Sequence, residues 1–389
     1  MVDLQRVVIL SVSAGAGHMR AAEAIRSALR EECPAAETTI LDTFRYTSPL
    51  LEKVVLGTYM EMLKVTPVVY GYLYRQAESG QPLSGFAKQE FNRILNKFTA
   101  PRLVQFLNQK RPQVVVCTHP FPVGVLDRLK ERGLFGASVL ATITDFTVHP
   151  FWVFPTVEAY AVADDGLRPA LTGQGIAPER VHATGIPIDP LFERPVDRRE
   201  VLSRLELAGD PPVVLVIGGG LGLGPLAEVV QALGGGDVPC QILVVAGSNE
   251  QLRARLERMT ASLVNPVRVF GFVQNIHELM SAADLLVGKA GGLTCAEAMA
   301  KGLPVFICDP LPGQEERNAQ FLQEAGAALL VDGTKQLVAE LRAVLTSPER
   351  LRAMSAAAGR LGRPRAARAV VDLLIRLLQE RPAVGNACD

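Results

Sequence analysis

The sequence predicts an α/β protein made of two doubly wound parallel sheets. Two segments begin alike, each with a continuous apolar run of strand length, a loop of small residues and then a helix. Their first residues, Arg6 and Pro212, stand about 200 positions apart. Later apolar runs show no alternation, which is typical of strands in a parallel sheet covered by helices on both faces. The two separate starts favour two domains over one long sheet.

Each expected element follows from the pattern of apolar residues. The helix after the first loop places Ala22, Ile25 and Leu29 on one stripe, which predicts a helix over 19–30. Its counterpart in the second half starts at Pro225, a residue suited to the first turn of a helix. The expected strands are 6–12, 113–118, 138–144, 212–217, 240–246, 284–288 and 304–308, and further helices are expected at 197–207 and 366–380.

The boundary between the domains is expected near residues 186–211. Two prolines within 186–190 interrupt regular structure, and a second break follows at 209–212. This division gives a first domain over 1–195 and a second over 196–365. The remaining residues, 366–389, carry the amphipathic helix at the end of the chain.

Composition restricts the possible functions. Forty Lys and Arg residues balance forty Asp and Glu residues, and the pI is near 7.0. A protein that binds nucleic acid over its whole surface would be basic, so no nucleic-acid partner is expected. The six cysteines and five histidines show no metal-ligand spacing. We therefore expect no cofactor and no metal ion.

No segment of the sequence predicts passage through a membrane. The longest uncharged run, 211–227, has 17 residues, of which five are Gly and three are Pro. A transmembrane helix needs about 20 apolar residues. The first residues also lack the pattern of a signal peptide. We expect a cytoplasmic protein whose membrane contact is peripheral.

Segment 44–111 differs from the rest of the chain. It holds ten Lys and Arg residues against four Asp and Glu residues, and five of the six tyrosines. One interpretation is an insertion that packs on the first domain and leaves a solvated basic face. The other is an interfacial surface, in which aromatic rings lie at the level of the lipid headgroups and lysines meet anionic lipid. The residues alone leave both open.

The first loop, residues 15–18, ends in Gly17 and His18 at the start of a helix. Glycine lets the backbone approach a ligand, and a helix N-terminus favours an anion. The loop lacks the full dinucleotide-binding pattern. At the carboxyl edge of the strands, a neutral His18 could accept a proton from a hydroxyl nucleophile. The alternative is a helix-capping or structural histidine.

Two further loops have the composition of a phosphate and sugar site. Residues 218–224 contain five glycines but no Lys-Ser/Thr pair follows, which predicts a phosphate cradle other than a P-loop. In the second loop, Gly291, Gly292 and Thr294 supply donors at another helix start, and Glu297 can accept bonds from sugar hydroxyls. No Asp-x-Asp occurs to hold a divalent ion, so helix N-termini must neutralise a diphosphate.

Polar residues also follow the other expected strands. Gln314 and Glu315 come after the strand at 304–308 and could read the hydroxyls of a hexose. Residues 144–152 follow another strand and contain the single tryptophan of the chain. We expect an acceptor site built from Asp145, His149, Phe151 and Trp152. The alternative for this segment is a core corner in which Asp145 caps a turn.

Five ordered motifs resemble those of the diacylglycerol glycosyltransferases. These enzymes comprise the plant-type monogalactosyldiacylglycerol synthases and the bacterial processive diacylglycerol glucosyltransferases, and are similar to the peptidoglycan GlcNAc transferase. The motifs are SAGAGHMRAAEAI (13–25), TDFTVHPFW (144–152), GIPIDPLF (185–192), GGGLGLGP (218–225) and GGLTCAEAMAKGLPVFICDPLPGQEERNA (291–319). The resemblance implies a GT-B fold, with two Rossmann-like domains that face a cleft. It also implies that the helix at 366–380 crosses back to the first domain, which attaches to the membrane and binds the acceptor.

The resemblance implies roles for individual residues. His18 matches the candidate base, and Asp145 and His149 match the acceptor-side motif. The positions that match donor-binding residues are Gly219 and Gly220 for the diphosphate, Phe272 and Val273 beside uracil, Glu297 for the ribose, and Gln314 and Glu315 for the sugar. One departure is Ala290, where relatives often have proline; this change removes no hydrogen-bond donor.

The function implied is an inverting, metal-independent transfer of glucose or galactose from a UDP-sugar to the hydroxyl of 1,2-diacylglycerol. The expected partners are the UDP-sugar, diacylglycerol in a membrane and an anionic phospholipid surface on the inner face of the cell membrane. Three alternatives stay open: a transferase for another lipid-linked acceptor of the peptidoglycan-precursor type, a UDP-sugar epimerase of the same fold, and a non-enzymatic sensor of lipid or nucleotide.

Overall fold

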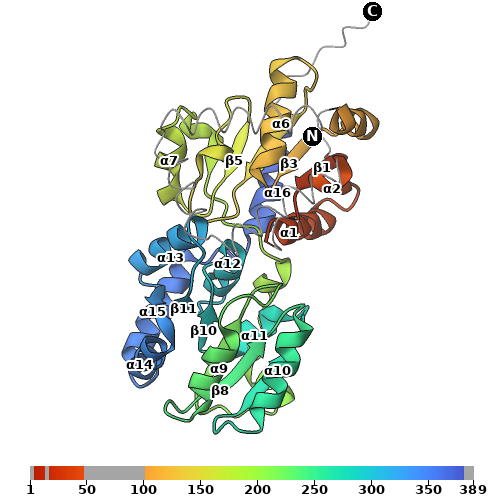
Figure 1. Ribbon diagram of the computed structural model, residues 1–389. Helices are drawn as coiled ribbons and strands as arrows, with labels where there is room; N and C mark the ends of the chain where they lie inside the picture. The colour runs from red at the N-terminus through yellow and green to blue at the C-terminus, as the bar shows by residue number, and fades with distance from the viewer. Residues whose placement is uncertain (1–3, 14–16, 48–100, 381–389) are drawn as a thin grey trace, which may run out of the picture. The chain divides into compact units, whose positions relative to one another are not determined.

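The computed structural model describes residues 4–13, 17–47 and 101–380 of the chain. The chain divides into two compact units. Unit 1 comprises residues 1–190 together with 365–389, and unit 2 comprises residues 191–364. Each unit contains a six-stranded parallel sheet flanked by helices (Figure 1). The prediction of two doubly wound, Rossmann-like domains is confirmed.

The order in which strands are added to the sheet of unit 1 reverses next to its first strand. Its strands are β1 (Arg6–Ser11), β2 (Glu37–Asp42), β3 (Val114–Cys117), β4 (Ser138–Thr142), β5 (Ala159–Ala161) and β6 (Val181–His182). Their order in the sheet is β2-β1-β3-β4-β5-β6. The chain therefore builds outward from β1 on one side and then returns to add β3 on the other. Ligands of such sheets bind at this switch point, outside the carboxyl ends of the strands.

Two helices far apart in the sequence cover one face of this sheet. Helix α1 (Gly17–Glu32) packs against α16 (Ala366–Gln379), which follows unit 2 in the chain (Figure 1). One hydrophobic cluster joins apolar residues of α1 and α16 to strands β1, β3, β4 and β5. Arg368 of α16 adds ion pairs to Glu31 and Glu32 of α1. Helix α16 is thus part of the core of unit 1.

The other described elements of unit 1 are short, apart from α6. Helix α6 begins at Pro120, directly after β3 and the capping residue His119. Residues 101–110, which lead into β3, are helical. The described helices and 3₁₀ turns of this part are α2 (Thr43–Thr47), α6 (Pro120–Glu131), η1 (Pro150–Trp152), η2 (Asp165–Leu167), α7 (Arg168–Thr172) and η3 (Pro178–Arg180).

Unit 2 is built in a similar way, but two strands instead of one are added outward from its first strand before the chain returns. Its strands are β7 (Val213–Ile217), β8 (Gln241–Val245), β9 (Val267–Phe270), β10 (Leu285–Gly288), β11 (Val305–Cys308) and β12 (Ala328–Val331). Their order is β12-β11-β10-β7-β8-β9, so the switch point lies between β7 and β10. The helices are α8 (Arg198–Arg204), α9 (Leu226–Gly234), α10 (Glu250–Thr260), α11 (Ile276–Ala282), α12 (Gly292–Ala300), α13 (Gln314–Glu324), α14 (Gly333–Leu345) and α15 (Pro348–Leu361), and η4 (Pro190–Glu193) bridges the boundary.

The elements expected from the sequence are present and differ mainly at their ends, while strands β2, β5, β6, β9 and β12 were not expected. Helix α1 begins at Gly17, so His18 lies within its first turn rather than before it. Pro225 precedes the first residue of α9 instead of opening the helix. Most of the basic, aromatic segment 44–111 lies outside the described residues. Among the helices that are described, none has the length and apolar character needed to cross a membrane.

Candidate active site

His18 lies at the switch point of unit 1, where three strands end. Its Nδ1 atom is 2.8 Å from the carbonyl oxygen of Thr118 and 2.9 Å from Oγ1 of Thr144. Thr118 follows β3 and Thr144 follows β4, while α1 itself follows β1. The carboxyl ends of β1, β3 and β4 therefore converge on one imidazole ring, which is the arrangement expected of a ligand site in this fold.

Thr118 holds the backbone of His18 as well as its ring. The buried Thr118 Oγ1 lies 3.1 Å from the carbonyl oxygen of His18 and 2.9 Å from Oγ of Ser11, the last residue of β1. The backbone N–H of Thr118 also donates to the carbonyl of Leu10. These bonds connect the first turn of α1 to both neighbouring strands and fix the position of His18.

A second histidine, His119, lies beside the first. The two rings meet edge to face, with centroids 4.7 Å apart and an interplanar angle of 80°. Nδ1 of His119 accepts a 3.1 Å bond from the N–H of Phe121 and thereby caps α6. Sequence reasoning missed this residue. The signal that could have found it is its place directly after the strand next to β1, at the same sheet edge as His18.

The environment keeps both rings uncharged. Burial lowers the pKa of His18, and the nearby Asp145 carboxylate and the bond to the Thr118 carbonyl offset only part of this effect. Burial, together with the neighbouring His18, holds the pKa of His119 well below its ordinary value. Both imidazoles are therefore neutral at pH 7, and a neutral imidazole can accept a proton.

The expected acceptor-side residues separate into a core part and an exposed part. His149 is buried, and its Nδ1 accepts from the N–H of Phe151 to cap η1. Trp152 is 2% exposed and belongs to the core. The ring of Phe151 packs edge-on against His149 and is 38% exposed. The burial of Trp152 favours the core-corner interpretation for that residue, and Phe151 presents the apolar surface.

In unit 2, the glycine-rich loop after β7 requires its glycines. Gly222 has a φ of 61°, and a Cβ atom there would lie 2.1 Å from the carbonyl oxygen of Ala246. The carbonyl of Gly220 accepts bonds from both the N–H and Oγ of Ser248. The loop thus packs directly on the connection after β8, and Gly219 and Gly220 lie in its first turn. Glycines at these positions leave the backbone open to a ligand.

A second loop leads from β10 into α12 at the same switch point. Gly291 precedes α12 and has no side chain that could cap the helix. The first backbone N–H groups of α12 are therefore not covered by a capping side chain. Gly292 opens the helix and Thr294 lies in its first turn. Glu297, one turn further, is 5% exposed. The side chain that the sequence analysis assigns to the sugar hydroxyls is thus buried.

The loop before α13 is ordered by its own carboxylates and by one amide. Oε2 of Glu315 accepts a 2.7 Å bond from the N–H of Leu311. The fully buried Asn318 donates from Nδ2 to the carbonyl of Ala290, 2.9 Å away. Asn318 thereby ties α13 to the loop that carries Gly291. Gln314 is the first residue of α13, so it stands at the same end of the helix as Glu315.

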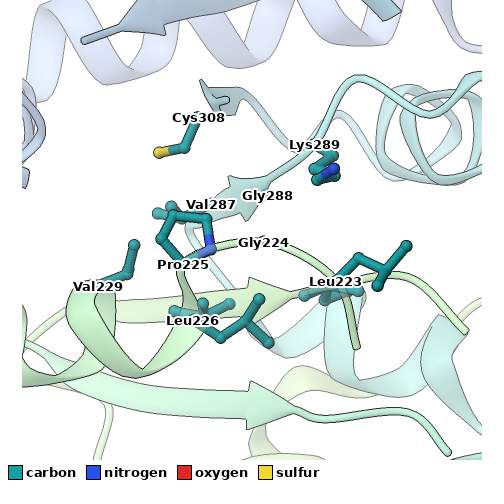
Figure 2. Close-up of a pocket in the computed structure, with 11 residues that line it drawn as sticks. Leu223, Gly224, Pro225, Leu226, Val229, Val287, Gly288, Lys289 and Cys308 are labelled. Atoms are coloured by element: carbon teal, nitrogen blue, oxygen red, sulfur yellow. The ribbon is translucent and has the colours of Figure 1, made fainter. Parts of the chain in front are cut away.

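The glycine-rich loop and the β10 loop line a common pocket, shown in Figure 2. Lys289 reaches this pocket, and its Cε atom would lie 3.4 Å from a Cβ atom at Gly224. Within the described parts of the chain, its ammonium group makes no ion pair or hydrogen bond. The lining residues are Val216, Ile217, Leu223, Gly224, Pro225, Leu226, Val229, Val287, Gly288, Lys289 and Cys308. Sequence reasoning did not single out Lys289.

Phe272 and Val273 follow β9, an edge strand of unit 2. Phe272 is 59% exposed and Val273 is half-buried. An exposed aromatic ring at this edge offers a flat apolar surface. In the residues that the structure describes, no group of three His, Cys, Asp or Glu side chains is placed to hold a metal ion.

The structure thus gathers the candidate residues into two sets. In unit 1 it brings together His18, Thr118, His119 and Thr144, with the Asp145 carboxylate acting on His18. In unit 2 it brings the glycine-rich loop together with the loop before α12 and, through Asn318, with the start of α13. Each set lies at the switch point of its own sheet.

Comparison with known proteins identifies both halves of the chain. Residues 18–188 match the family model of monogalactosyldiacylglycerol (MGDG) synthase, and residues 213–370 match that of the glycosyltransferase family 28 C-terminal domain. A processive diacylglycerol beta-glucosyltransferase of Bacillus mycoides (strain KBAB4) is 28% identical over 377 residues, which are 96% of this chain and 94% of that protein. The enzyme of the same description from Bacillus cytotoxicus is 27% identical over the same shares.

Solved structures share the fold. MurG of Acinetobacter baumannii superposes with a TM-score of 0.62 at 19% identity, covering 96% of this chain and 99% of that one. A UDP-N-acetylglucosamine 2-epimerase gives a TM-score of 0.60 at 14% identity, covering 98% of both chains. The Anabaena protein Alr3699/HepE in complex with UDP-glucose gives 0.54 at 15% identity, covering 95% and 99%. The two halves of the chain thus resemble the MGDG synthase family and the family 28 C-terminal domains, and this chain is a glycosyltransferase of the GT-B fold.

Proposed function

We propose that this enzyme transfers glucose or galactose from a UDP-sugar to the hydroxyl of 1,2-diacylglycerol, with inversion at the anomeric carbon and without a metal ion. The observation that carries the proposal is a neutral, rigidly held His18 at the switch point of a unit that matches the MGDG synthase family model. The names of the curated relatives, which act on diacylglycerol, support the same acceptor.

The residues of unit 2 would bind the donor. The glycine-rich loop and the start of α12 present backbone N–H groups to the diphosphate, and the Lys289 ammonium adds a positive charge beside them. Glu297 would accept bonds from the ribose hydroxyls, and Phe272 with Val273 would contact uracil. Gln314 and Glu315 would bind the hexose. With these groups in place, a divalent ion is not needed to balance the diphosphate.

The residues of unit 1 would activate the acceptor. The primary hydroxyl of diacylglycerol loses its proton to His18 as its oxygen attacks the anomeric carbon. The bond between that carbon and the diphosphate breaks, and its electron pair leaves with UDP. Asp145 stabilises the imidazolium that forms, because an opposite charge favours the protonated ring. A single displacement of this kind inverts the anomeric configuration.

The acceptor lies in a membrane, so the enzyme would work at a lipid surface. We propose peripheral attachment to the inner face of the cell membrane, through anionic phospholipid and the basic, aromatic segment 44–111. In its described flanks, Tyr46 is 39% exposed and packs edge-on against Phe106. Exposed aromatic residues beside basic ones suit the level of the lipid headgroups.

A UDP-release assay tests the function. It uses mixed vesicles of diacylglycerol and anionic phospholipid, with UDP-glucose and UDP-galactose in parallel and EDTA present. We expect one donor to support release that depends on diacylglycerol, and the anomeric proton coupling of the glycolipid to show inversion. His18→Ala should lower the rate by about 10²- to 10⁴-fold, the usual contribution of a general base.

The other outcomes separate the remaining candidates. Release that needs a different lipid-linked acceptor would replace diacylglycerol as substrate. Conversion of the UDP-sugar to its epimer without release of UDP would show an epimerase instead. Binding of UDP without any turnover would leave only a sensor.

A further inference from the structure

The Thr118 carbonyl and the Thr144 hydroxyl both lie within hydrogen-bond distance of Nδ1 of His18. This arrangement determines which ring nitrogen carries the proton. The carbonyl oxygen of Thr118, 2.8 Å from Nδ1, can only accept a hydrogen bond, so Nδ1 must donate it. In the other tautomer, the Nδ1 lone pair would face the carbonyl lone pairs across the same distance. A neutral His18 therefore keeps its proton on Nδ1 and has its lone pair on Nε2.

Thr144 extends this contact. Its hydroxyl oxygen, 2.9 Å from Nδ1, accepts a share of the same N–H. When Nε2 takes up a second proton, Nδ1–H becomes a stronger donor, and the bonds to Thr118 and Thr144 shorten as charge-assisted bonds. Bonds that strengthen as charge develops lower the barrier of the chemical step rather than only the energy of the resting enzyme.

The surroundings make this geometry rigid. Thr144 is 4% exposed, and Thr118 is fully buried and bonded to Ser11 and to the backbone of His18. The ionisable groups that face the His18 ring are His119, edge-on at 4.7 Å, and Asp145. In the described residues, the groups within hydrogen-bond distance of Nδ1 are the Thr118 carbonyl and the Thr144 hydroxyl, and these set the direction of the ring proton.

We propose that Thr144 is a positioning residue which, with the Thr118 carbonyl, holds His18 as the Nδ1–H tautomer and makes Nε2 the atom that deprotonates the acceptor. The inference rests on the proposed sugar transfer and names the atom that performs its proton step. The hydroxyl proton moves to the Nε2 lone pair while the acceptor oxygen bonds to the anomeric carbon, and the electron pair of the broken bond leaves on UDP.

The tautomer can be measured without turnover. Histidine is labelled selectively with ¹⁵N in the full-length protein, and His18→Gln identifies the signals of His18. At neutral pH we expect Nδ1 to resonate as a protonated nitrogen and Nε2 as an unprotonated one. In Thr144→Val the bias toward this form should weaken. A proton on Nε2 in the wild-type protein would overturn the proposal.

Kinetics test the role of the Thr144 hydroxyl. We expect Thr144→Val to lower kcat about tenfold while KM for the UDP-sugar stays unchanged, and Thr144→Ser, which keeps the hydroxyl, to recover most of the loss. Thr142→Val is the matched control. Thr142 is also buried, and it lies in β4, but its Oγ1 has no hydrogen-bond partner in the described structure. The kcat of Thr142→Val should therefore equal that of the wild-type enzyme.

The outcomes are distinct from those of the proposed function. Equal rates for Thr144→Val and Thr142→Val would overturn the positioning role, as would a serine variant that is as slow as the valine variant. If the wild-type protein transfers no sugar, the proposed function fails, and the proposal about the catalytic proton fails with it. The NMR result then still decides whether the threonines select the Nδ1–H tautomer.

Discussion

His18 combines a low affinity for protons with a fixed position. Burial lowers its pKa, so the ring is already neutral where an exposed histidine would be partly charged. We expect kcat/KM to stay level through neutral pH and to fall only when the pH drops below the ordinary range of histidine, because protonated His18 cannot act as a base. A pH–rate profile of the wild-type enzyme measures this, and an acid limb centred above pH 7 would contradict it.

Asp145 opposes that shift through its charge. In Asp145→Asn the pKa of His18 should fall further, since the carboxylate that favours the charged ring is gone. The acid limb should move to lower pH, and kcat should fall roughly tenfold because the imidazolium loses a stabilising charge. An acid limb that stays in place would show that Asp145 does not act on His18.

Lys289 should contribute to the binding of UDP but not to that of uridine. If its ammonium meets the diphosphate, Lys289→Met weakens UDP binding about tenfold and leaves uridine binding unchanged. Titration calorimetry of both ligands measures the ratio. Lys335→Met removes one exposed positive charge from the same unit and serves as control. A uniform loss for both ligands in Lys289→Met would instead indicate damage to the pocket.

At the scale of the element, α16 should be a large contributor to the stability of unit 1. Leu374 is fully buried against the α1 side of the sheet. Leu374→Ala should lower the free energy of unfolding by about 2–5 kcal/mol, through lost burial and the cavity left behind. Arg368→Ala on the same helix should cost at most about 1 kcal/mol, as its ion pairs are partly exposed. Urea unfolding of both variants compares them, and similar losses would contradict this division.

The membrane-binding role proposed for segment 44–111 can be tested by changing several of its basic residues together. Replacing four of its Lys and Arg residues with glutamine should weaken binding to vesicles of anionic phospholipid. It should also make the remaining binding more sensitive to salt. The four positions, which lie outside the described residues, are Lys53, Lys64, Arg75 and Lys88.

A matched quadruple variant controls for net charge in this experiment. It replaces four exposed cations of unit 2, namely Arg258, Lys335, Arg352 and Arg360. Vesicle flotation across a salt series compares the two variants. Equal binding by both would show that segment 44–111 has a structural role instead.

The strands show why part of the fold was predictable from sequence. Strands β1, β3, β4, β7, β8, β10 and β11 are buried on both faces and were read from continuous apolar runs. The strands at the sheet edges are β2, β6, β9 and β12. Their partly exposed sequences, such as ETTILD in β2, give no such run. Strand β5 is interior but has only three residues.

The candidate site was predictable only in part, for a related reason. Glycine loops and His18 are visible because each follows an apolar strand directly. The partners of His18 were not visible, since Thr118 and Thr144 act through a backbone carbonyl and a hydroxyl from distant strands. Lys289 was missed because its place beside Gly224 in the pocket depends on the order of β7 and β10 in the sheet, which a local pattern does not contain.

At the scale of the molecule, acid should destabilise the two units unequally. The histidines with lowered pKa values, His18, His119 and His182, all belong to unit 1. The unfolded chain binds protons at these groups near pH 6.5, while the folded unit resists them. Stability is therefore fully present above pH 6.5 and decreases as the pH falls through and below that value.

Calorimetry can resolve this difference. Between about pH 7.5 and pH 5.5, the melting transition of unit 1 should move to lower temperature more than that of unit 2. Added UDP should raise the transition of unit 2 and thereby identify it, since a ligand stabilises the state that binds it. Equal acid shifts of both transitions would contradict the prediction.

The path of the chain through α16 has a consequence for synthesis on the ribosome. The strands of unit 1 emerge first, but the helix that covers one of their apolar faces emerges only after residues 191–364. At about 5–20 residues per second, that delay lasts on the order of ten seconds or more. During this time the nascent first unit exposes the surface that Leu373 and Leu374 later bury, which makes it a substrate for the chaperones that bind apolar nascent chains.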